Sequence, residues 1–222
     1  MGLRGPKPKG KAKRIWSAEL AYAVGLLATD GCLSGDGRHI DLTSQDKEQL
    51  KNFMKCIGVT HKISQKRSGY TEKLQTRVQF SDVLFYQFLV DAGLTPAKSK
   101  TIGPLAIPPK YFFDFLRGAF DGDGCFYSYF DQRWKSSFMY YLVFTSASMA
   151  HIEWIRGKLR NSLGVNGHIT FGGQHASVYN LKYAKKEALK ILKKMYKEKK
   201  CVRLTRKWKK VKKALQINGE VL

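Results

Sequence analysis

The hydrophobic pattern divides the first part of the chain into alternating helical and extended segments. Apolar residues recur at helical spacing in three segments, at 18–29, 44–57 and 81–92. Between them, segments of shorter period predict β-strands within residues 32–43, 60–66 and 74–81. Gly35-Asp36-Gly37 is typical of a hairpin turn and divides the first extended segment into two strands. This region therefore reads helix, two strands, helix, two strands, helix.

The same order of elements recurs after residue 105. Helices are expected at 112–122 and 146–163 and from residue 185, with strands at 125–130, 138–145, 166–171 and 177–182. Short sequences correspond in order, and the clearest pair is Asp30-Gly31-Cys32 and Asp123-Gly124-Cys125. A period of about 90–105 residues is too long for a solenoid repeat. We therefore expect two copies of one α+β unit, related by a pseudo-two-fold axis.

The length of the chain is consistent with this duplication. Its 222 residues, 43% of them hydrophobic, are enough for two small subdomains. We expect a flexible basic arm over residues 1–14, an N-terminal subdomain over 15–105 and a C-terminal subdomain over 106–222. The arm contains prolines, glycines and no acid. It is suited to following a phosphate backbone or entering a minor groove, and equally to increasing solubility alone.

The charge of the chain changes the picture most. Forty Lys and Arg face 17 Asp and Glu, which gives a formal net charge of +23. Such a charge favours a polyanionic partner, and nucleic acid is the natural one because phosphate contacts release condensed counterions. The sequence offers neither a long amphipathic helix nor an apolar run of about 18 residues, so a membrane partner is not expected. Composition alone does not separate DNA from RNA, or an enzyme from a binding protein.

The four cysteines show no paired metal-ligand spacing, which argues against a zinc site. Together with the absence of a recognisable signal peptide, they indicate reduced thiols and an intracellular protein of undetermined compartment.

Two predicted helices end on acids, at Asp30-Gly31 and at Asp121-Gly122-Asp123-Gly124. A single Asp-Gly after a helix is ordinary stop-and-turn chemistry. However, a helix C-terminus carries partial negative charge, so a carboxylate there is unfavourable unless a cation offsets it. Mg²⁺ accepts carboxylate and carbonyl oxygens, and a helix end offers both. The small residues Gly25 and Gly118 would allow the two helices to pack closely and bring their acids together.

At these residues the sequence resembles a known family. Residues 23–31 (Ala-Val-Gly-Leu-Leu-Ala-Thr-Asp-Gly) and 116–124 (Leu-Arg-Gly-Ala-Phe-Asp-Gly-Asp-Gly) resemble the two motifs of single-chain LAGLIDADG homing endonucleases. The resemblance covers about residues 15–215 and implies an α+β fold with two pseudo-symmetric αββαββα subdomains. In that fold the motif helices pack at the centre and the sheets form a saddle that binds DNA.

The resemblance also implies a reaction. Family members hydrolyse one phosphodiester bond in each strand of a long double-stranded DNA target and leave 3′ overhangs. They work as single-chain monomers with two or three Mg²⁺ ions, Mn²⁺ substitutes for Mg²⁺, and Ca²⁺ supports binding without cleavage. Carried over, Asp30 and Asp123 are the catalytic and metal-binding acids, and the carbonyls of Thr29 and Gly122 are further metal ligands. The role of Asp121 is left open, because Ala28 stands at its position in the first copy.

Basic and polar side chains usually surround such a site. Lys98 matches a family position near the scissile phosphate, and Arg203 is the candidate in the second half. Ser44 with Gln45, and Ser146, open the second helix of each half, where polar groups organise water. Phosphate binding and helix capping are the simpler roles for these residues.

Strand parity predicts a surface that reads DNA bases. Gln and Arg suit bidentate contacts to adenine and guanine. The candidate DNA-binding residues are Lys62, Ser64, Lys66, Arg67, Gln75, Arg77, Gln79, Gln132, Arg133, Lys135, His168, Thr170, Tyr179 and Lys182. The lysine-rich C-terminal stretch over 182–213, predicted to be helical, is expected to contact phosphates.

Three functions remain in competition on the sequence alone. The first is a site-specific DNA endonuclease, encoded within an intron or free-standing. The second is a binding protein on the same scaffold, either a maturase that acts on its host intron RNA or a DNA-binding regulator that does not cleave. A basic ribosome-associated protein explains the charge but not the duplicated acidic helix ends.

Overall fold

The structure is a computed structural model that describes residues 10–67, 74–134, 136–172 and 177–220. The first half begins with helix α1 (Ala18–Asp30), for which Ser17 is the N-cap and accepts a hydrogen bond from the Leu20 amide. The elements that follow are β1 (Gly31–Leu33), β2 (His39–Ser44), α2 (Lys47–Ile57), β3 (Ser64–Arg67), β4 (Leu74–Ser81), α3 (Val83–Asp91) and the short 3₁₀ helix η1 (Lys98–Lys100).

The second half repeats this order. After a 3₁₀ turn, η2 (Pro109–Tyr111), it contains α4 (Phe112–Asp121), β5 (Cys125–Phe130), β6 (Phe138–Ser146), α5 (Met149–Leu163), β7 (His168–Phe171), β8 (Tyr179–Ala184), α6 (Lys185–Met195) and α7 (Thr205–Ile217). The element order expected from the hydrophobic pattern is confirmed.

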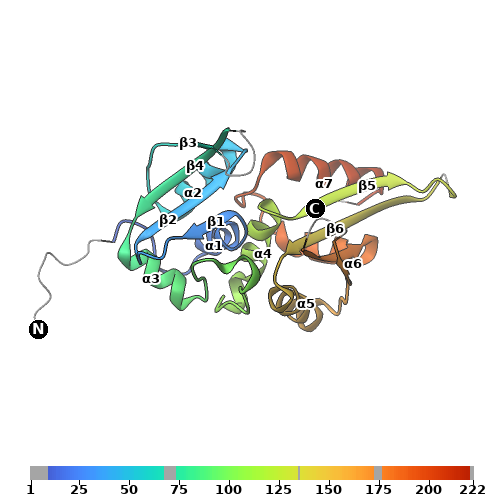
Figure 1. Ribbon diagram of the computed structural model, residues 1–222. Helices are drawn as coiled ribbons and strands as arrows, with labels where there is room; N and C mark the ends of the chain where they lie inside the picture. The colour runs from blue at the N-terminus through green and yellow to red at the C-terminus, as the bar shows by residue number, and fades with distance from the viewer. Residues whose placement is uncertain (1–9, 68–73, 135, 173–176, 221–222) are drawn as a thin grey trace, which may run out of the picture.

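Both halves build an antiparallel sheet with the same topology. The strand orders are β1-β2-β4-β3 and β5-β6-β8-β7. One face of each sheet packs on helices, and the apolar residues of the strands point to it, for example Ile40 and Leu42 in the first half and Tyr140 and Leu142 in the second. The two sheets lie on either side of the central helices α1 and α4 (Figure 1). This is the predicted α+β class with two αββαββα units.

The helices α1 and α4 pack directly against each other at the centre. A Cβ atom on Gly25 would lie 2.2 Å from the Phe115 carbonyl oxygen, and one on Gly118 would lie 2.0 Å from the Tyr22 carbonyl oxygen. Real Cβ atoms do not approach backbone so closely, so only glycine allows this crossing. The glycines of the two motifs therefore set the distance between the two helix ends.

The end of the segment before α7 and the first residues of α7 contact the opposite half. The Asn52 side chain on α2 donates to the carbonyl oxygen of Arg203 at 3.0 Å. The Thr205 amide donates to Glu48 at 3.1 Å, and Arg206 forms an ion pair with Asp46 at 2.7 Å. These contacts join α2 of the first half to the start of α7 in the second.

Two basic segments of the chain show further detail. The amides of Lys11 and Ala12 both donate to Asp82, and the Lys13 amide donates to the Ile57 carbonyl. The backbone of residues 11–13, at the end of the predicted arm, therefore lies against the first subdomain. The basic C-terminal stretch is divided into α6 and α7 with a connecting segment between them. None of the helices in the described part of the chain has the length and apolar content needed to cross a membrane.

Candidate active site

The two motif acids converge where α1 and α4 end. Asp30 is the last residue of α1, and Asp123 lies two residues beyond the end of α4. A Cβ atom on Gly122 would be 3.1 Å from Asp30 Oδ2, so the Asp30 carboxylate lies against the backbone that leads into Asp123. Burial and the nearby Asp123 charge raise the pKa of Asp30 to about 6. The structure therefore brings the two predicted acids together.

Asp123 is more exposed to solvent than Asp30. Crowding by protein atoms raises its pKa, and the nearby Lys207 and Lys98 oppose that rise. Its residue remains exposed to solvent while that of Asp30 is half-buried. The effect of desolvation is therefore smaller at Asp123, which is the more accessible of the two carboxylates.

The glycine after each acid has the same local reason. A Cβ atom on Gly31 or on Gly124 would lie 2.6 Å from the Cα atom of Leu27 or Phe120, respectively. The chain thus turns sharply back over the last helical turn in both halves.

A buried lysine binds the backbone beside Asp30. Lys98 in η1 is 6% exposed, and its ammonium group donates to the Gly31 carbonyl oxygen. Burial lowers the pKa of Lys98, and the charges of Asp30 and Asp123 act in the opposite direction. Ala97 before it has φ of 53°, in the left-handed region that favours glycine. The left-handed backbone at Ala97 thus immediately precedes Lys98, whose ammonium group lies beside Asp30.

A second buried lysine binds the corresponding backbone in the other half. Lys207 Nζ donates to the carbonyl oxygens of Phe120 at 2.6 Å, Gly122 at 2.7 Å and Gly124 at 2.7 Å. Burial lowers the pKa of Lys207 to about 8. It comes from α7, far along the chain, and no short motif marks it.

The predicted basic residue of the second half is placed elsewhere. The Arg203 guanidinium lies over the Trp208 ring at 4.4 Å and donates to the Lys199 carbonyl at 3.2 Å. The lysine that contacts the backbone on either side of Asp123 is Lys207. In this half the geometry thus assigns the basic position to Lys207.

A glutamine missed by the sequence analysis orients Asp30. Gln49 Nε2 donates to Asp30 Oδ2 at 2.7 Å, and the Ser44 hydroxyl donates to Gln49 Oε1 at 3.1 Å. Ser44 therefore acts through Gln49, and Gln45 lies in the same hollow near Asp30. Gln49 is the third residue after Asp46, the N-cap of α2. A comparison of the residues at this position in the two halves would have identified it.

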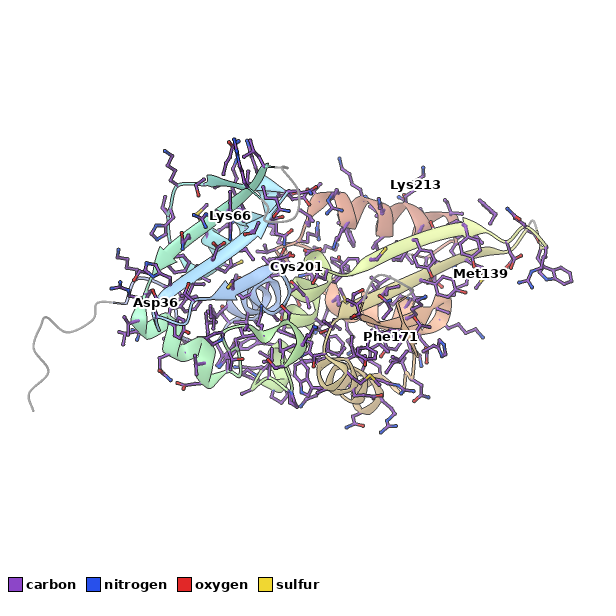
Figure 2. The ribbon with its side chains drawn as sticks, in the orientation of Figure 1. Asp36, Lys66, Met139, Phe171, Cys201 and Lys213 are labelled. Atoms are coloured by element: carbon purple, nitrogen blue, oxygen red, sulfur yellow. The ribbon has the colours of Figure 1, made fainter. Side chains whose placement is uncertain are left out.

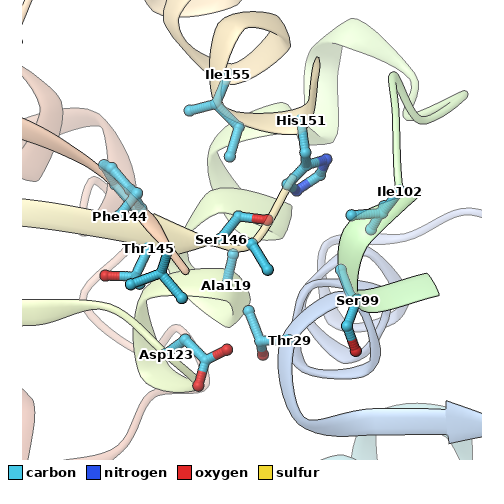
Figure 3. Close-up of a pocket in the computed structure, with 13 residues that line it drawn as sticks. Thr29, Ser99, Ile102, Ala119, Asp123, Phe144, Thr145, Ser146, His151 and Ile155 are labelled. Atoms are coloured by element: carbon cyan, nitrogen blue, oxygen red, sulfur yellow. The ribbon is translucent and has the colours of Figure 1, made fainter. Parts of the chain in front are cut away.

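His151 is the equivalent residue of the second half, three positions after the N-cap Ser148 of α5. Its Nδ1 lies 2.9 Å from the Gly103 carbonyl oxygen, and burial lowers its pKa. Figure 3 shows His151 and Ser146 in a cavity whose opposite side carries Asp123, Thr29 and Ser99. Ser146 thus lines the same cavity as Asp123, and its hydroxyl accepts a hydrogen bond from the Ser148 amide.

Asp121 points away from the acids and into the protein. Its Oδ2 accepts hydrogen bonds from the Tyr22 hydroxyl at 2.8 Å and from the Leu204 amide at 2.7 Å. Leu204 is the N-cap residue of α7, which carries Lys207 three residues later. Burial raises the pKa of Asp121 to about 6. The carboxylate that the sequence left without a role therefore anchors the helix that supplies Lys207.

The oxygen donors at the site suit a hard divalent cation. Two carboxylates with raised pKa values lie beside helix-end carbonyls, and no cluster of three or more His, Cys, Asp or Glu side chains occurs among the described residues. Mg²⁺ needs only one or two carboxylates and keeps several waters, whereas a structural zinc site needs four protein ligands. The Gly122 carbonyl already accepts Lys207, while the Thr29 hydroxyl bonds within its own helix.

The outward face of the first sheet carries most of its predicted DNA contacts. The register pairs Ser64 with Arg77 and Lys66 with Gln75, and Gln79 lies opposite Asp41. Arg77 is held by Asp41 at 3.1 Å. Figure 2 shows Lys66 on this sheet. Lys62 is exposed just before β3.

One residue of that set lies on the opposite face. Arg67 pairs with Leu74, whose strand parity matches that of Thr76 and Val78. It is exposed, but it does not share the surface of Ser64 and Lys66.

The second sheet confirms part of the predicted face. His168 pairs with Lys182, and Thr170 pairs with Asn180, on the outward side. Tyr179 instead pairs with Phe171, and their rings are 5.1 Å apart on the side that packs on the core. The expectation for Tyr179 was wrong, because the strand starts at Tyr179 in register with Phe171 and shares the parity of Leu181 and Tyr183.

The loop between β5 and β6 is exposed where it is described. Gln132 and Arg133 face solvent, and Arg133 bonds to Asp131. Lys135 lies outside the described residues.

Comparisons with known proteins agree with this architecture. No protein-family model matches the chain, and no curated protein matches its sequence. Among solved structures, the homing endonuclease I-WcaI bound to its DNA recognition sequence has a TM-score of 0.59 at 11% identity, over 95% of this chain and 94% of that chain. A variant of I-DmoI in complex with its target DNA and magnesium has a TM-score of 0.53 at 16% identity, over 82% and 97%.

A third similar structure comes from another kind of protein. Full-length DUF199/WhiA from Thermatoga maritima has a TM-score of 0.56 at 14% identity, over 94% of this chain. The chain spans 63% of the length of that protein, whose N-terminal LAGLIDADG domain also matches on its own. At these identities the likeness establishes the fold. The chain has the LAGLIDADG fold that homing endonucleases share with this domain of WhiA.

Proposed function

We propose that this protein is a site-specific endonuclease that uses Mg²⁺ to hydrolyse one phosphodiester bond in each strand of double-stranded DNA and leaves 3′ overhangs. The observation that carries the proposal is the pair of acids at the ends of two helices in contact, each beside a buried lysine. Asp30 has Lys98 on the next carbonyl, and Asp123 has Lys207 on the carbonyls around it. A purely structural helix end has no need of two carboxylates with raised pKa values in one place.

The two carboxylates would hold the divalent metal, with the Thr29 carbonyl as a further donor, while the Gly122 carbonyl, which accepts Lys207, could offer only its second lone pair. The metal supplies an activated water and stabilises the charge that develops on the attacked phosphate. Gln49 keeps one oxygen of Asp30 fixed and favours its ionised form. The side chains of this chain therefore contribute a fixed, anionic cradle at the centre of the saddle.

Lys98 and Lys207 place positive charge beside the acids without leaving the protein interior. Each ammonium group is held by backbone carbonyls, so its position is fixed before a phosphate arrives. Preorganised charge of this kind stabilises a transition state more than a mobile surface lysine does. One such lysine in each half fits a reaction that takes place once on each strand.

The duplex would lie across the outward faces of both sheets. Arg77, Gln75 and Gln79 are suited to base edges, and the basic C-terminal helices add phosphate contacts. One chain supplies both halves of the site, which fits action as a monomer. Several fold neighbours are described in complex with target DNA, which supports duplex DNA as the partner.

The test uses a duplex that carries the sequence at which the gene of this protein is inserted. We expect tight binding with Ca²⁺ or Mg²⁺, cleavage with Mg²⁺ only, and recessed 5′ ends on both products. The control is a duplex of the same length in which the insertion-site sequence is shuffled. Binding to both duplexes alike, with no cleavage in any divalent metal, would remove the proposal.

A DNA-binding protein that does not cleave is the second candidate. It is favoured by the likeness to WhiA, which is as close as the likeness to the nucleases. Specific binding to the insertion-site duplex without cleavage would support this candidate.

A further inference from the structure

The outward faces of the two sheets differ in chemistry. In the first sheet this face carries charged and amide side chains, among them Lys66, Arg77 and Gln79. In β5 and β6 the outward positions carry no charge. They are Cys125, Tyr127 and Tyr129 on β5 and Met139, Tyr141, Val143 and Thr145 on β6, and Val143 is itself buried.

Three of these side chains form an exposed aromatic ladder. The Tyr127 and Tyr141 rings stack at 5.2 Å, and the Tyr129 and Tyr141 rings stack at 6.3 Å. Tyr127 and Tyr129 are nevertheless 39% and 45% exposed. Because the rings cover one another's flat faces, they present mainly ring edges and hydroxyls to solvent. Stacking also restricts their rotamers, so little freedom is lost when a ligand binds.

The ladder begins at the base of a projecting ribbon, with Tyr127 and Tyr141, and continues onto it with Tyr129. Strand β8 pairs with β6 only from Tyr141 onward, so residues 138–140 and their partners 128–130 form a two-stranded extension. Figure 1 shows this hairpin reaching beyond the other strands, and Figure 2 shows Met139 on it. A two-stranded ribbon fits the width of the B-DNA major groove. Lys210 beside Tyr127 provides flanking positive charge, and Arg133 near the tip, 84% exposed at its side chain, is paired with Asp131.

We infer that the β5–β6 ribbon reads thymine methyl groups in the major groove of the half-site that it covers. Thymine is the base with an apolar group in that groove, and apolar side chains recognise it by contact. A face of stacked tyrosines and a methionine lacks the bidentate donors that select guanine or adenine. The first sheet has such donors in Arg77, Gln75 and Gln79. The target is therefore asymmetric, with purine readout under the first sheet and methyl readout under the β5–β6 ribbon.

This inference rests on the proposed binding of duplex DNA, and its test separates the two claims. Duplexes are selected from a random 24-base-pair library with the wild-type chain in Ca²⁺, and again with Arg77→Ala. The half whose consensus relaxes in the variant lies under the first sheet. We expect thymines at two or more fixed positions in the other half.

Deoxyuridine then replaces those thymines one at a time, which removes only the methyl group. We expect each replacement under the β5–β6 ribbon to weaken binding about threefold to fivefold, and replacement in the first half to have little effect. Tyr129→Phe keeps the ring and should keep this sensitivity. Tyr129→Ser removes the ring and should weaken binding to the thymine duplex while abolishing the loss on uridine substitution at the position it contacts.

The outcomes are distinct. A selected duplex that binds equally well with thymine and uridine overturns methyl readout and leaves the proposed function standing. Sensitivity to uridine that persists unchanged in Tyr129→Ser, Tyr127→Ser and the double variant also overturns it. Failure to select any duplex removes both claims.

Discussion

The two halves of the molecule share one fold but support their acids differently. In the first half, Gln49 donates to Asp30, and Lys98 arrives from the segment after α3. In the second half, the equivalent residue His151 turns to Gly103, and the described residues donate no hydrogen bond to the Asp123 carboxylate. Lys207 arrives from α7, an element with no helical counterpart in the first half.

This difference shows what a duplicated fold conserves. The glycine contacts between α1 and α4 fix the positions of the helix ends and are the same in both halves. The side chains that set the protonation and charge of each acid come from outside the helix pair and have diverged. We therefore expect the two strands of a bound duplex to be cut at unequal rates. The following predictions test the comparison, from the largest effect to the smallest.

The shared helix contact should be the least tolerant feature. Gly118→Ala places a Cβ 2.0 Å from the Tyr22 carbonyl oxygen, so the helices must separate. We expect a loss of about 3 kcal/mol or more in the free energy of unfolding, measured by urea denaturation. Gly157→Ala on α5 is the matched control, since nothing lies within 4 Å of its Cβ position. It should be neutral or stabilise by up to about 1 kcal/mol. Equal effects of the two substitutions would contradict the close crossing.

The two buried lysines should act on different strands. Lys98→Met and Lys207→Met keep the length of the side chain but remove the charge, and each should slow cleavage by about 10²–10³-fold. The strand served by Lys98 should be affected more by the first variant, and the other strand by the second. Nicked and linear plasmid products, resolved with end-labelled strands, measure this. Lys209→Met, on the exposed side of α7, removes at most a phosphate contact and should leave both rates unchanged at saturating protein concentration.

The Gln49 contact should make one half sensitive to pH. Gln49→Ala removes a hydrogen bond that favours ionised Asp30, so the pKa of Asp30 rises above its present value of about 6. We expect roughly tenfold slower cleavage near pH 6 and recovery above pH 8, where Asp30 is ionised in either protein. A pH–rate profile parallel to that of the wild type would argue against this role. Gln87→Ala, at an exposed pair on α3, is the control.

In the absence of metal, the ionised Asp30 carboxylate should lower the stability of the folded protein. Its folded-state pKa of about 6 lies above the ordinary value of 3.8, so its ionised form is disfavoured by folding at pH 7. Asp30→Asn should raise the free energy of unfolding by about 1–2 kcal/mol above pH 6, and the gain should vanish as pH falls below about 4. Thermal or urea denaturation in EDTA across this pH range measures the effect. A gain that is independent of pH would show that the charge is not its cause.

Much of the fold and part of the site could be predicted from the sequence, because they depend on local patterns that occur twice. The helical spacing of apolar residues predicts the order of the elements. Both acids are indicated by the two Asp-Gly-Cys sequences and by the glycines at positions 25 and 118. Lys98 was assigned from the family resemblance, because it matches a position near the scissile phosphate. The alternation of β3 and β4 also places Lys66, Gln75 and Arg77 on one face.

The remaining features depend on contacts between distant segments. Lys207 reaches carbonyls more than 80 residues away, and nothing in a lysine-rich helix distinguishes the one that turns inward. Arg203 was the basic residue expected in the second half, but its guanidinium lies over the Trp208 ring. Tyr179 was assigned to the outward face, but within β8 it shares the parity of the buried Leu181 and Tyr183. Asp121 could not be assigned until the start of α7 was placed against it.

The central claim is that Asp30 and Asp123 form one metal-dependent site for cleavage. The most direct measurement compares the wild-type chain with the double variant Asp30→Asn, Asp123→Asn on the insertion-site duplex, with binding followed in Ca²⁺ and cleavage in Mg²⁺. We predict affinities within a few-fold of each other and cleavage by the wild type only. Undiminished cleavage by the double variant would contradict the account.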